Sequence, residues 1–429
     1  MITAATTLLV VLFVWILIEA VLHVLVSKLR PSFQWLIGPG DVAPEIGTEI
    51  VRQYMERSFD SELGWLRKPG STGTDQGDCG TVHFRIDDAG CRANPNFERS
   101  PSDVAVFGDS YAFCRLVRDD ETWPHFLSVG LKTNVRNFGV GNYGIDQALL
   151  RLERELPRLD SKIIVMGIVH ETIARAHSYW KHYFEYGNVL AFKPRFALSE
   201  GTLIHHRPAM QTPADFASYR QKLDRIQALD RFYLDKFRRD LLKFPYLPRL
   251  IARWRRHAPI LWHLACGRLS SRHENGRRKA LEVVARENGR VTAALFSDPS
   301  AKALLTEILR RFADSCMKWD RLPLLIVLPQ PVDVEWRSTG RDDSRSYFAE
   351  LDGILPVIDF TDRIMNWPNW RSLYVGGPLG LGPHFNATGN QLIATVVAEH
   401  IERLKPIGAT VLDRGYCGGI KAKSPRACA

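Results

Sequence analysis

The chain has 429 residues, of which 45% are hydrophobic and 24% charged, a composition that excludes global disorder and fits one large domain with insertions or two domains. An excess of 57 Lys and Arg over 47 Asp and Glu gives a net charge of +10, which favours association with anionic surfaces. No zinc-finger, basic-zipper or RNA-binding motif accompanies this charge, so we expect no nucleic-acid partner.

The chain opens on an apolar run. Residues 6–26, TTLLVVLFVWILIEAVLHVLV, are close to the roughly 20 residues that cross a bilayer as a helix. No basic residue precedes the run and no small-residue cleavage site is evident, so we predict an uncleaved membrane anchor. Charge counting on Lys28 and Arg30 places the body on the cytoplasmic side, but two charges leave the side open. Glu19 and His23 share one face of this helix, and we expect them to snorkel to the interface.

Cysteine usage points to no metal. The seven cysteines are scattered without any C-x-x-C spacing, and no phosphate-binding loop is present, so we expect neither a metal nor an organic cofactor. Cys79 and Cys91 flank a short strand-like segment and would pair if the body faces an oxidising compartment. The compartment therefore stays open.

Strands alternate with helices along the middle and the end of the chain. Apolar runs predict strands at 104–107, 134–138, 162–168, 324–328 and 357–359, and helices near 122–131, 145–156 and 393–404. Such alternation is typical of a parallel sheet with right-handed crossovers.

The alternation is interrupted by a basic segment. Residues 219–257 hold 12 Lys and Arg against 4 Asp and read as helical. Residues 249–256 mix aromatic and basic side chains as a membrane-surface helix would, although a solvated helix face explains the same charge. The predicted organisation is an anchor (1–30), a small β-rich leader layer (31–100), the two halves of an α/β domain (101–176 and 321–405), a helical insertion between them (177–320) and a tail (406–429).

The first strand leads to a serine. The run at 104–107 is typical of a strand buried on both faces, and Gly108, Asp109 and Ser110 follow where the chain turns into a helix. Gly108 supplies backbone freedom, and Ser110 falls at the carboxyl edge of the sheet, where open α/β folds place ligands. We expect Asp109 to brace this turn. The same three residues also fit an ordinary strand-to-helix turn in which the serine only caps the helix.

Three loops are predicted to meet at that edge. They hold Ser110, the glycine-rich stretch 139–144 and His384. Ester chemistry needs a nucleophile, a base and donors for the oxyanion. The imidazole of His384 titrates near neutrality and suits the base, and the N–H groups of Ser110 and of Gly141 or Asn142 suit the oxyanion hole.

These residues resemble the SGNH (GDSL) hydrolases and related acyltransferases. The GDS at 108–110 resembles the family's first block, which holds the nucleophile, NFGVGNYG at 137–144 is similar to the second block, and HFNATGN at 384–390 is similar to the last. The resemblance covers about 104–173 and 322–404. It implies a three-layer α/β/α fold with a flavodoxin-like parallel sheet and, more narrowly, a membrane-anchored member associated with bacterial surface polysaccharides.

The third block departs from the family pattern. It normally supplies an Asn side chain to the oxyanion, whereas GIVHET at 167–172 contains none. His170 or Thr172 would donate instead, although His170 also fits a polar residue satisfied at the sheet edge. Asn142 stands where the family usually has Gly, which matters less because the donor there is a main-chain N–H.

The last block departs as well. The family usually has an Asp three residues before the histidine to orient its ring, and here that position is Leu381. Asp359, Asp362 or a backbone carbonyl would orient His384 instead.

A charged pair and three aromatic residues follow the third strand. Glu171 and Arg175 are spaced as an i,i+4 ion pair, which we interpret as structural. Tyr179, Trp180 and Tyr183 lie near the same edge and either stack on sugar rings or pack locally.

We therefore predict a serine esterase or O-acyltransferase that acts on acyl esters, by resemblance those of a cell-envelope polysaccharide, with Ser110 as nucleophile and His384 as base. One alternative is a catalytically degenerate relative that binds or assembles polysaccharide, which the missing Asn and Asp favour. Another is a lipid esterase at the membrane face, which the anchor and the basic insertion favour. The acyl donor, hydrolysis versus transfer and the oligomeric state stay open.

Overall fold

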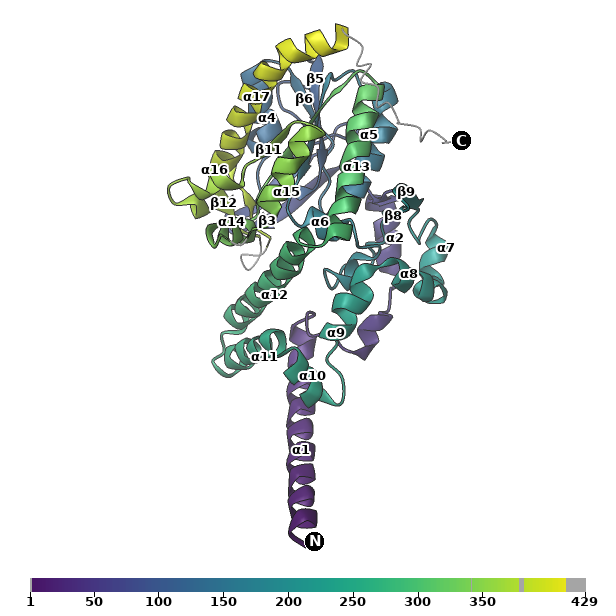
Figure 1. The fold of residues 1–429 in the computed structure, drawn as a ribbon, viewed down its shortest axis with the longest axis vertical. Helices are drawn as coiled ribbons and strands as arrows, with labels where there is room; N and C mark the ends of the chain where they lie inside the picture. The colour runs from purple at the N-terminus through teal and green to yellow at the C-terminus, as the bar shows by residue number, and fades with distance from the viewer. Residues whose placement is uncertain (1, 341, 378–381, 414–429) are drawn as a thin grey trace, which may run out of the picture.

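An isolated apolar helix leads into the body of the protein. The computed structural model describes residues 2–340, 342–377 and 382–413. Helix α1 (Ile2–Leu29) projects away from the rest of the chain, and its side chains from Leu8 to Val24 are largely exposed (Figure 1). Of the helices in these ranges, it is the one long and apolar enough to span a membrane.

A five-stranded parallel sheet forms the centre of the body. Its strands are β5 (Ser102–Gly108), β6 (Asn134–Asn137), β7 (Ile163–Ile168), β10 (Leu322–Val327) and β11 (Val357–Asp359). They lie in the order β11-β10-β7-β5-β6, and every neighbouring pair is parallel. Counted as the chain supplies them, the order is therefore 2-1-3-4-5. The five predicted strands are confirmed, with ends shifted by no more than two residues.

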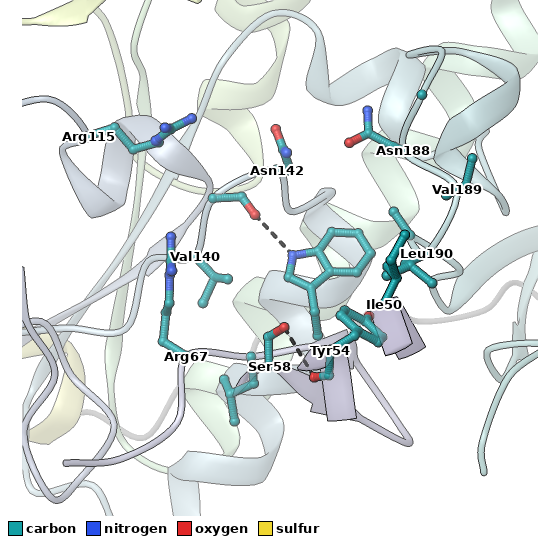
Figure 2. Close-up of a pocket in the computed structure, with 15 residues that line it drawn as sticks. Ile50, Tyr54, Ser58, Arg67, Arg115, Val140, Asn142, Asn188, Val189 and Leu190 are labelled. Atoms are coloured by element: carbon teal, nitrogen blue, oxygen red, sulfur yellow. Dashed lines mark hydrogen bonds between the residues drawn. The ribbon is translucent and has the colours of Figure 1, made fainter. Parts of the chain in front are cut away.

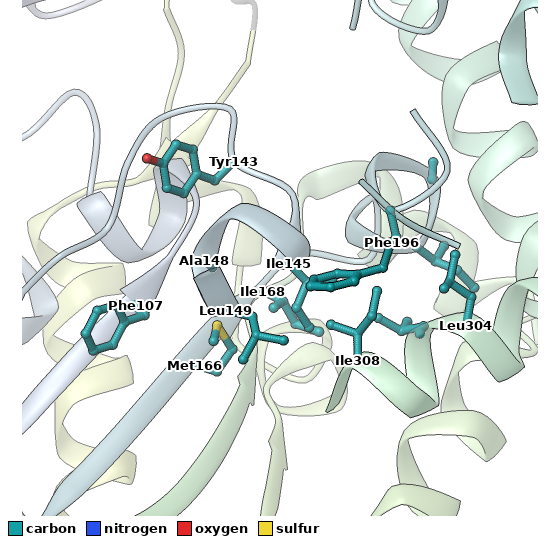
Figure 3. Packing of buried hydrophobic residues seen from close by; sticks show 14 of the residues in the cluster. Phe107, Tyr143, Ile145, Ala148, Leu149, Met166, Ile168, Phe196, Leu304 and Ile308 are labelled. Atoms are coloured by element: carbon teal, nitrogen blue, oxygen red, sulfur yellow. The ribbon is translucent and has the colours of Figure 1, made fainter. Parts of the chain in front are cut away.

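Helices cover both faces of the sheet. Alternate residues of β5 point to opposite sides, so Val104 and Val106 join one core and Ala105 and Phe107 the other. The first core is completed by α4 (Trp123–Leu131) and α17 (Ala387–Asp413), and the second by α5 (Ile145–Glu155) and α13 (Pro299–Lys318). Figure 3 shows the second core, where residues of α5 and β7 lie next to Ile308 of α13.

The segment before the sheet contains two hairpins and a helix. These are α2 (Thr48–Arg57), β1 (Phe59–Asp60) paired with β2 (Gly64–Trp65), and β3 (Thr72–Gly77) paired with β4 (Gly80–Arg85). Helix α2 is an addition to the expected β-rich leader. Cys79 and Cys91, considered as a pair from the sequence, are both free thiols, one exposed and one buried.

The segment between β7 and β10 is mainly helical. It contains α6 (Thr172–Arg175), the hairpin β8 (Arg195–Ser199) and β9 (Thr202–His206), and α7 (Pro213–Ala217), α8 (Leu223–Leu229), α9 (Arg238–Asp240), α10 (Tyr246–Ala252), α11 (Trp254–Leu269) and α12 (His273–Phe296). Helix α13 ends this segment and packs on the sheet, because the parallel step from β7 to β10 needs a crossover helix. The remaining elements are α3 (Ser110–Phe113), α14 (Pro331–Ser338), α15 (Ser344–Glu350), α16 (Thr361–Met365), β12 (Tyr374–Val375) and β13 (His384–Phe385).

Glu19 of α1 is bound within the protein and does not reach outward as expected. Its carboxylate accepts the backbone N–H groups of Tyr246 and Leu247 at 2.6 and 2.7 Å, and the side chain is buried. His23 lies on the same side, with Nδ1 3.3 Å from the hydroxyl of Tyr246. The expectation of snorkelling is wrong for Glu19, because the first N–H groups of α10 need an acceptor and the carboxylate supplies it.

Candidate active site

The turn after β5 holds Ser110 at the first position of α3. Asp109 caps this helix, since its Oδ1 accepts the N–H of Tyr111 at 2.8 Å. Gly108 has a φ of +148°, and a Cβ at this position would lie 2.0 Å from the carbonyl oxygen of Gly167 in β7. Only glycine lets the strand turn this close to its neighbour, which is why the hydroxyl of Ser110 comes to stand at the sheet edge.

His384 meets Ser110 across 274 residues of sequence. Its Nε2 lies 2.8 Å from Oγ of Ser110, and its Nδ1 lies 2.6 Å from the carbonyl oxygen of Gly382. A carbonyl oxygen only accepts, so Nδ1 bears the proton and Nε2 is left to accept the serine O–H. Tyr111 stacks on the imidazole at 4.6 Å between ring centroids and donates its hydroxyl to the carbonyl of Pro383, which fixes the ring further.

The imidazole is held neutral. Burial, followed by the positive charge of Arg115, lowers the pKa of His384 from 6.5 to about 3. Arg115 is itself held in place by Asp75, with Nη2 2.7 Å from Oδ1. A neutral imidazole is the form that can take a proton from the serine.

The glycine-rich loop packs against the turn that contains Ser110. The N–H of Val140 donates to the carbonyl of Gly108 at 3.0 Å, and a Cβ on Gly139 would lie 2.4 Å from the backbone nitrogen of Phe113. Trp65 fixes the far side of the loop, because its Nε1 donates to the carbonyl of Gly141 at 3.0 Å. With that carbonyl turned toward Trp65, the loop is held in one orientation.

Asn142 adopts a left-handed conformation in this loop, with a φ of +67°. Its carbonyl accepts from Nζ of Lys181 at 3.1 Å. In the parts of the chain that the structure describes, the N–H groups of Gly141 and Asn142 donate to no protein acceptor.

A buried ion network joins the serine turn to the loop. Arg175 contacts Oδ2 of Asp109 at 3.1 Å, the carbonyl of Tyr143 at 3.3 Å and Oε2 of Glu171 at 2.8 Å. Its guanidinium is almost fully buried. The predicted Glu171–Arg175 pair is present, and Arg175 also connects the two loops that hold the candidate oxyanion donors.

His170 and Thr172 are the two side chains predicted to donate to the oxyanion in place of the missing Asn. Nδ1 of His170 is 3.2 Å from Oδ2 of Asp333, and its ring packs edge-on against Phe296 and Phe348. Burial, the largest single influence, opposes charge on His170, but the carboxylates of Asp333, Asp359 and Asp342 together outweigh it and raise the pKa of the imidazole. Thr172 is buried at the start of α6. Among the described residues, neither makes a hydrogen bond or an ion pair with Ser110 or His384.

The acidic candidates Asp359 and Asp362 do not orient His384. Oδ2 of Asp359 and Oδ1 of Asp362 accept from the two Nη atoms of Arg337 at 2.8 and 3.0 Å. The carbonyl of Gly382 holds Nδ1 of His384 instead, which is the third possibility left open by the sequence. Leu381, where an acid was expected, lies outside the described residues.

The aromatic residues at 179, 180 and 183 are core residues. Tyr179, Trp180 and Tyr183 are fully buried, and Trp180 stacks on Phe192 at 4.8 Å between ring centroids. A side chain with no exposed surface cannot stack on a sugar ring, so the packing interpretation is the right one.

A cavity of about 520 Å³ adjoins the glycine-rich loop (Figure 2). Its wall includes Gly141 and Asn142 of that loop and Arg115, whose charge acts on His384. Ser110 and His384 are not among the residues that line it. The rest of the wall is formed by Ile50, Tyr54, Ser58, Trp65, Leu66, Arg67, Val140, Gly187, Asn188, Val189, Leu190 and Ala191.

Several residues of this region escaped the sequence analysis. The carbonyl of Gly382 is a main-chain group without a signature in the sequence, and Trp65, Arg67 and Arg115 come from segments remote from the motifs. Arg67 makes no ion pair within the described chain and lies over the ring of Phe84 at 4.8 Å. The distance of Trp65 and Arg67 along the chain from the motifs left no signal in the sequence that would have placed them at this loop.

No group of three metal-ligating side chains comes together in the described residues. Comparison with models of known protein families and with curated protein sequences gives no match. The site therefore has to be interpreted from its own geometry.

Proposed function

We propose that the protein is a serine esterase or O-acyltransferase acting on acyl esters, with a fold of the SGNH hydrolase type. The observation that supports the chemistry is the hydrogen bond between Oγ of Ser110 and Nε2 of His384 at 2.8 Å. The 2-1-3-4-5 strand order is that of flavodoxin-like sheets and so supports the fold. Sheets of this kind bind ligands at the carboxyl ends of their strands, and Ser110 follows the carboxyl end of β5.

In the proposed reaction, Oγ of Ser110 attacks the ester carbonyl carbon while its proton moves to Nε2 of His384. The negative charge that develops on the carbonyl oxygen is stabilised by the N–H groups of Ser110, Gly141 and Asn142. The intermediate then expels the alkoxide, which takes the proton from Nε2, and the acyl group stays on the serine. Water or a sugar hydroxyl attacks this acyl-enzyme by the same steps in reverse.

The carbonyl of Gly382 performs part of the work of an orienting acid. It accepts the proton on Nδ1 and so fixes the tautomer in which Nε2 is the base. It has no full negative charge with which to stabilise an imidazolium. We therefore expect a slower enzyme than one with a carboxylate at this position.

The proposed substrate is an acyl ester on an envelope glycan. The cavity at the glycine-rich loop combines two aromatic side chains, Tyr54 and Trp65, with Arg67, Arg115 and the amide of Asn188. Such a mixture of rings and hydrogen-bond donors suits a polar, ring-shaped ligand better than an acyl chain. The proposed location is at a membrane, with α1 as the anchor.

Labelling with a fluorophosphonate tests the chemistry. The reagent should modify Ser110, and Ser110→Ala should abolish the modification, as should His384→Ala. Ser338→Ala, an exposed serine at the end of α14, serves as the matched control and should label like the parent protein. Unmodified protein, under conditions that label another serine hydrolase, would refute the proposal.

The same labelling experiment tests the alternative that the protein binds polysaccharide without catalysis. That alternative is favoured by the low pKa of His384, about 3, because a weak base accepts the serine proton less readily. A folded protein that binds acylated glycan but does not react with the fluorophosphonate would establish it.

A further inference from the structure

Helices α10 and α11, together with Phe244 just before α10, expose large apolar side chains next to the N-terminal helix. The exposed fractions are 69% for Phe244, 62% for Ile251, 60% for Trp254, 67% for Trp262 and 88% for Leu269. Two tryptophans and a leucine exposed to this degree on one short segment are unusual for a surface in contact with water.

These side chains of α11 form a stripe. Trp254, Ala258, Trp262 and Leu269 are all exposed and follow the helical repeat. The opposite side of α11, with Ile260, Leu261 and Leu264, is buried in a core shared with α12. One apolar face of α11 is thus used for packing within the protein, while no residue of the described chain covers the other.

Helices α10 and α11, which bear the exposed apolar side chains, are hydrogen-bonded to α1. The carboxylate of Glu19 in α1 accepts the N–H groups of Tyr246 and Leu247 at the start of α10. Nη1 of Arg268, at the end of α11, donates to the carbonyl of Lys28 at 2.8 Å. At 1.5 Å per residue, Glu19 lies about 10 Å along the helix from Val26, where the apolar run ends. Helix α11 runs crosswise to α1 near the end of α1 that joins the body (Figure 1).

The segment is also strongly basic. Residues 244–279 hold nine Lys and Arg and a single acidic residue, Glu274. Arg255, Arg272, Arg277, Arg278 and Lys279 are all exposed. Anionic lipid headgroups attract clusters of this kind.

We propose that α10 and α11 lie in the interface of the bilayer that α1 crosses, with their exposed apolar face among the acyl chains and the exposed arginines of α11 and of the start of α12 at anionic headgroups. A helix with Trp and Leu on one face and Lys and Arg around it is typical of such a location. The contact between Glu19 and α10 places the start of α10 at the depth of the apolar part of α1. A soluble partner does not reach that depth, and this favours lipid as the occupant.

Cysteine accessibility in nanodiscs tests this placement. The full-length protein is reconstituted at one copy per disc in phosphatidylcholine with phosphatidylglycerol, and Cys79, Cys266, Cys417 and Cys428 are replaced by Ser. Leu269→Cys and Trp262→Cys are then labelled with a membrane-impermeant maleimide. Val129→Cys, an exposed position on α4 of the sheet domain, is the matched control.

Leu269→Cys and Trp262→Cys should react about tenfold more slowly than Val129→Cys, because a thiol in acyl chains neither ionises nor meets the reagent. All three should react alike after the protein is unfolded in detergent. Reaction of Leu269→Cys and Trp262→Cys within about twofold of the control would overturn the proposal, since roughly equal exposure to water leaves the thiolate equally available. Protection that appears only in discs with two copies would overturn it too, because a second copy would then be the occupant. Neither result depends on the chemistry proposed for Ser110.

Discussion

The protonation of His384 gives the sharpest prediction for activity. Burial and Arg115 hold its pKa at about 3, compared with 6.5 for a free imidazole. The acid limb of kcat/KM reports the pKa of the base in the free enzyme. Activity should therefore persist well below the pH at which a histidine-dependent esterase usually loses it.

The size of the effect follows from the two pKa values. At pH 5, an imidazole with a pKa of 6.5 is neutral in about 3% of molecules, so the rate would fall roughly 30-fold from its plateau. With a pKa of about 3, nearly all molecules remain neutral at pH 5, and kcat/KM should stay on the plateau. Arg115→Gln removes the second cause of the shift, so it should raise the pKa of His384 and move the acid limb upward.

The assay is hydrolysis of p-nitrophenyl acetate between pH 4 and 8, with circular dichroism at each pH. The folded protein binds fewer protons at His384 than the unfolded chain, so this residue's contribution to stability is complete above pH 6.5 and is lost as the pH falls toward about 3. The dichroism signal separates this acid unfolding from protonation of the base. A limb with its midpoint near pH 6.5 in fully folded protein would refute the reasoning.

Three substitutions test the structure around the site, and Gly340→Ala is the control for the first of them. Gly108→Ala should lower the free energy of unfolding, measured with denaturant, by about 3 kcal/mol or more, because its Cβ would meet the carbonyl of Gly167 at 2.0 Å. Gly340→Ala should lower it by about 1 kcal/mol, because Gly340 has a φ of +70° but open space around it. Arg175→Met should cost about 3–5 kcal/mol by the same measurement, since it leaves the buried carboxylate of Asp109 without a cation, and a loss below about 1 kcal/mol would contradict this. Trp65→Phe removes the hydrogen bond to the carbonyl of Gly141 and should lower kcat about tenfold at nearly unchanged Tm, and an unaltered kcat would show that the loop is held without it.

Parts of the fold that depend on local pattern could be predicted from the sequence. The run from Val104 to Phe107 is apolar at every position because β5 is buried on both faces, and this is visible without coordinates. Parallel strands bring their carboxyl ends to one edge, which accounts for the place of Ser110 directly after β5. His384 was expected in a loop at that edge but lies in β13, which pairs with β12 outside the five-stranded sheet, so its approach to Ser110 depends on packing that the edge argument does not describe.

Other features depend on packing between distant segments. His170 could have faced Ser110 or away from it, and only the position of Asp333 on α14 decides this. Glu19 gave no sign that its partner is the first turn of α10, more than 220 residues later. The orienting group of His384 is a carbonyl, which every residue has, so no pattern of side chains could identify it.

The separation of Ser110 from His384 by 274 residues has a consequence for biosynthesis. While a ribosome is still translating the helical segment after β7, the serine turn has already emerged, but the imidazole that would take its proton does not yet exist. Its hydroxyl is then no more reactive than that of any other serine. If the proposed reaction holds, a nascent chain is thus inert toward nearby esters until His384 has been synthesised and has packed against Ser110.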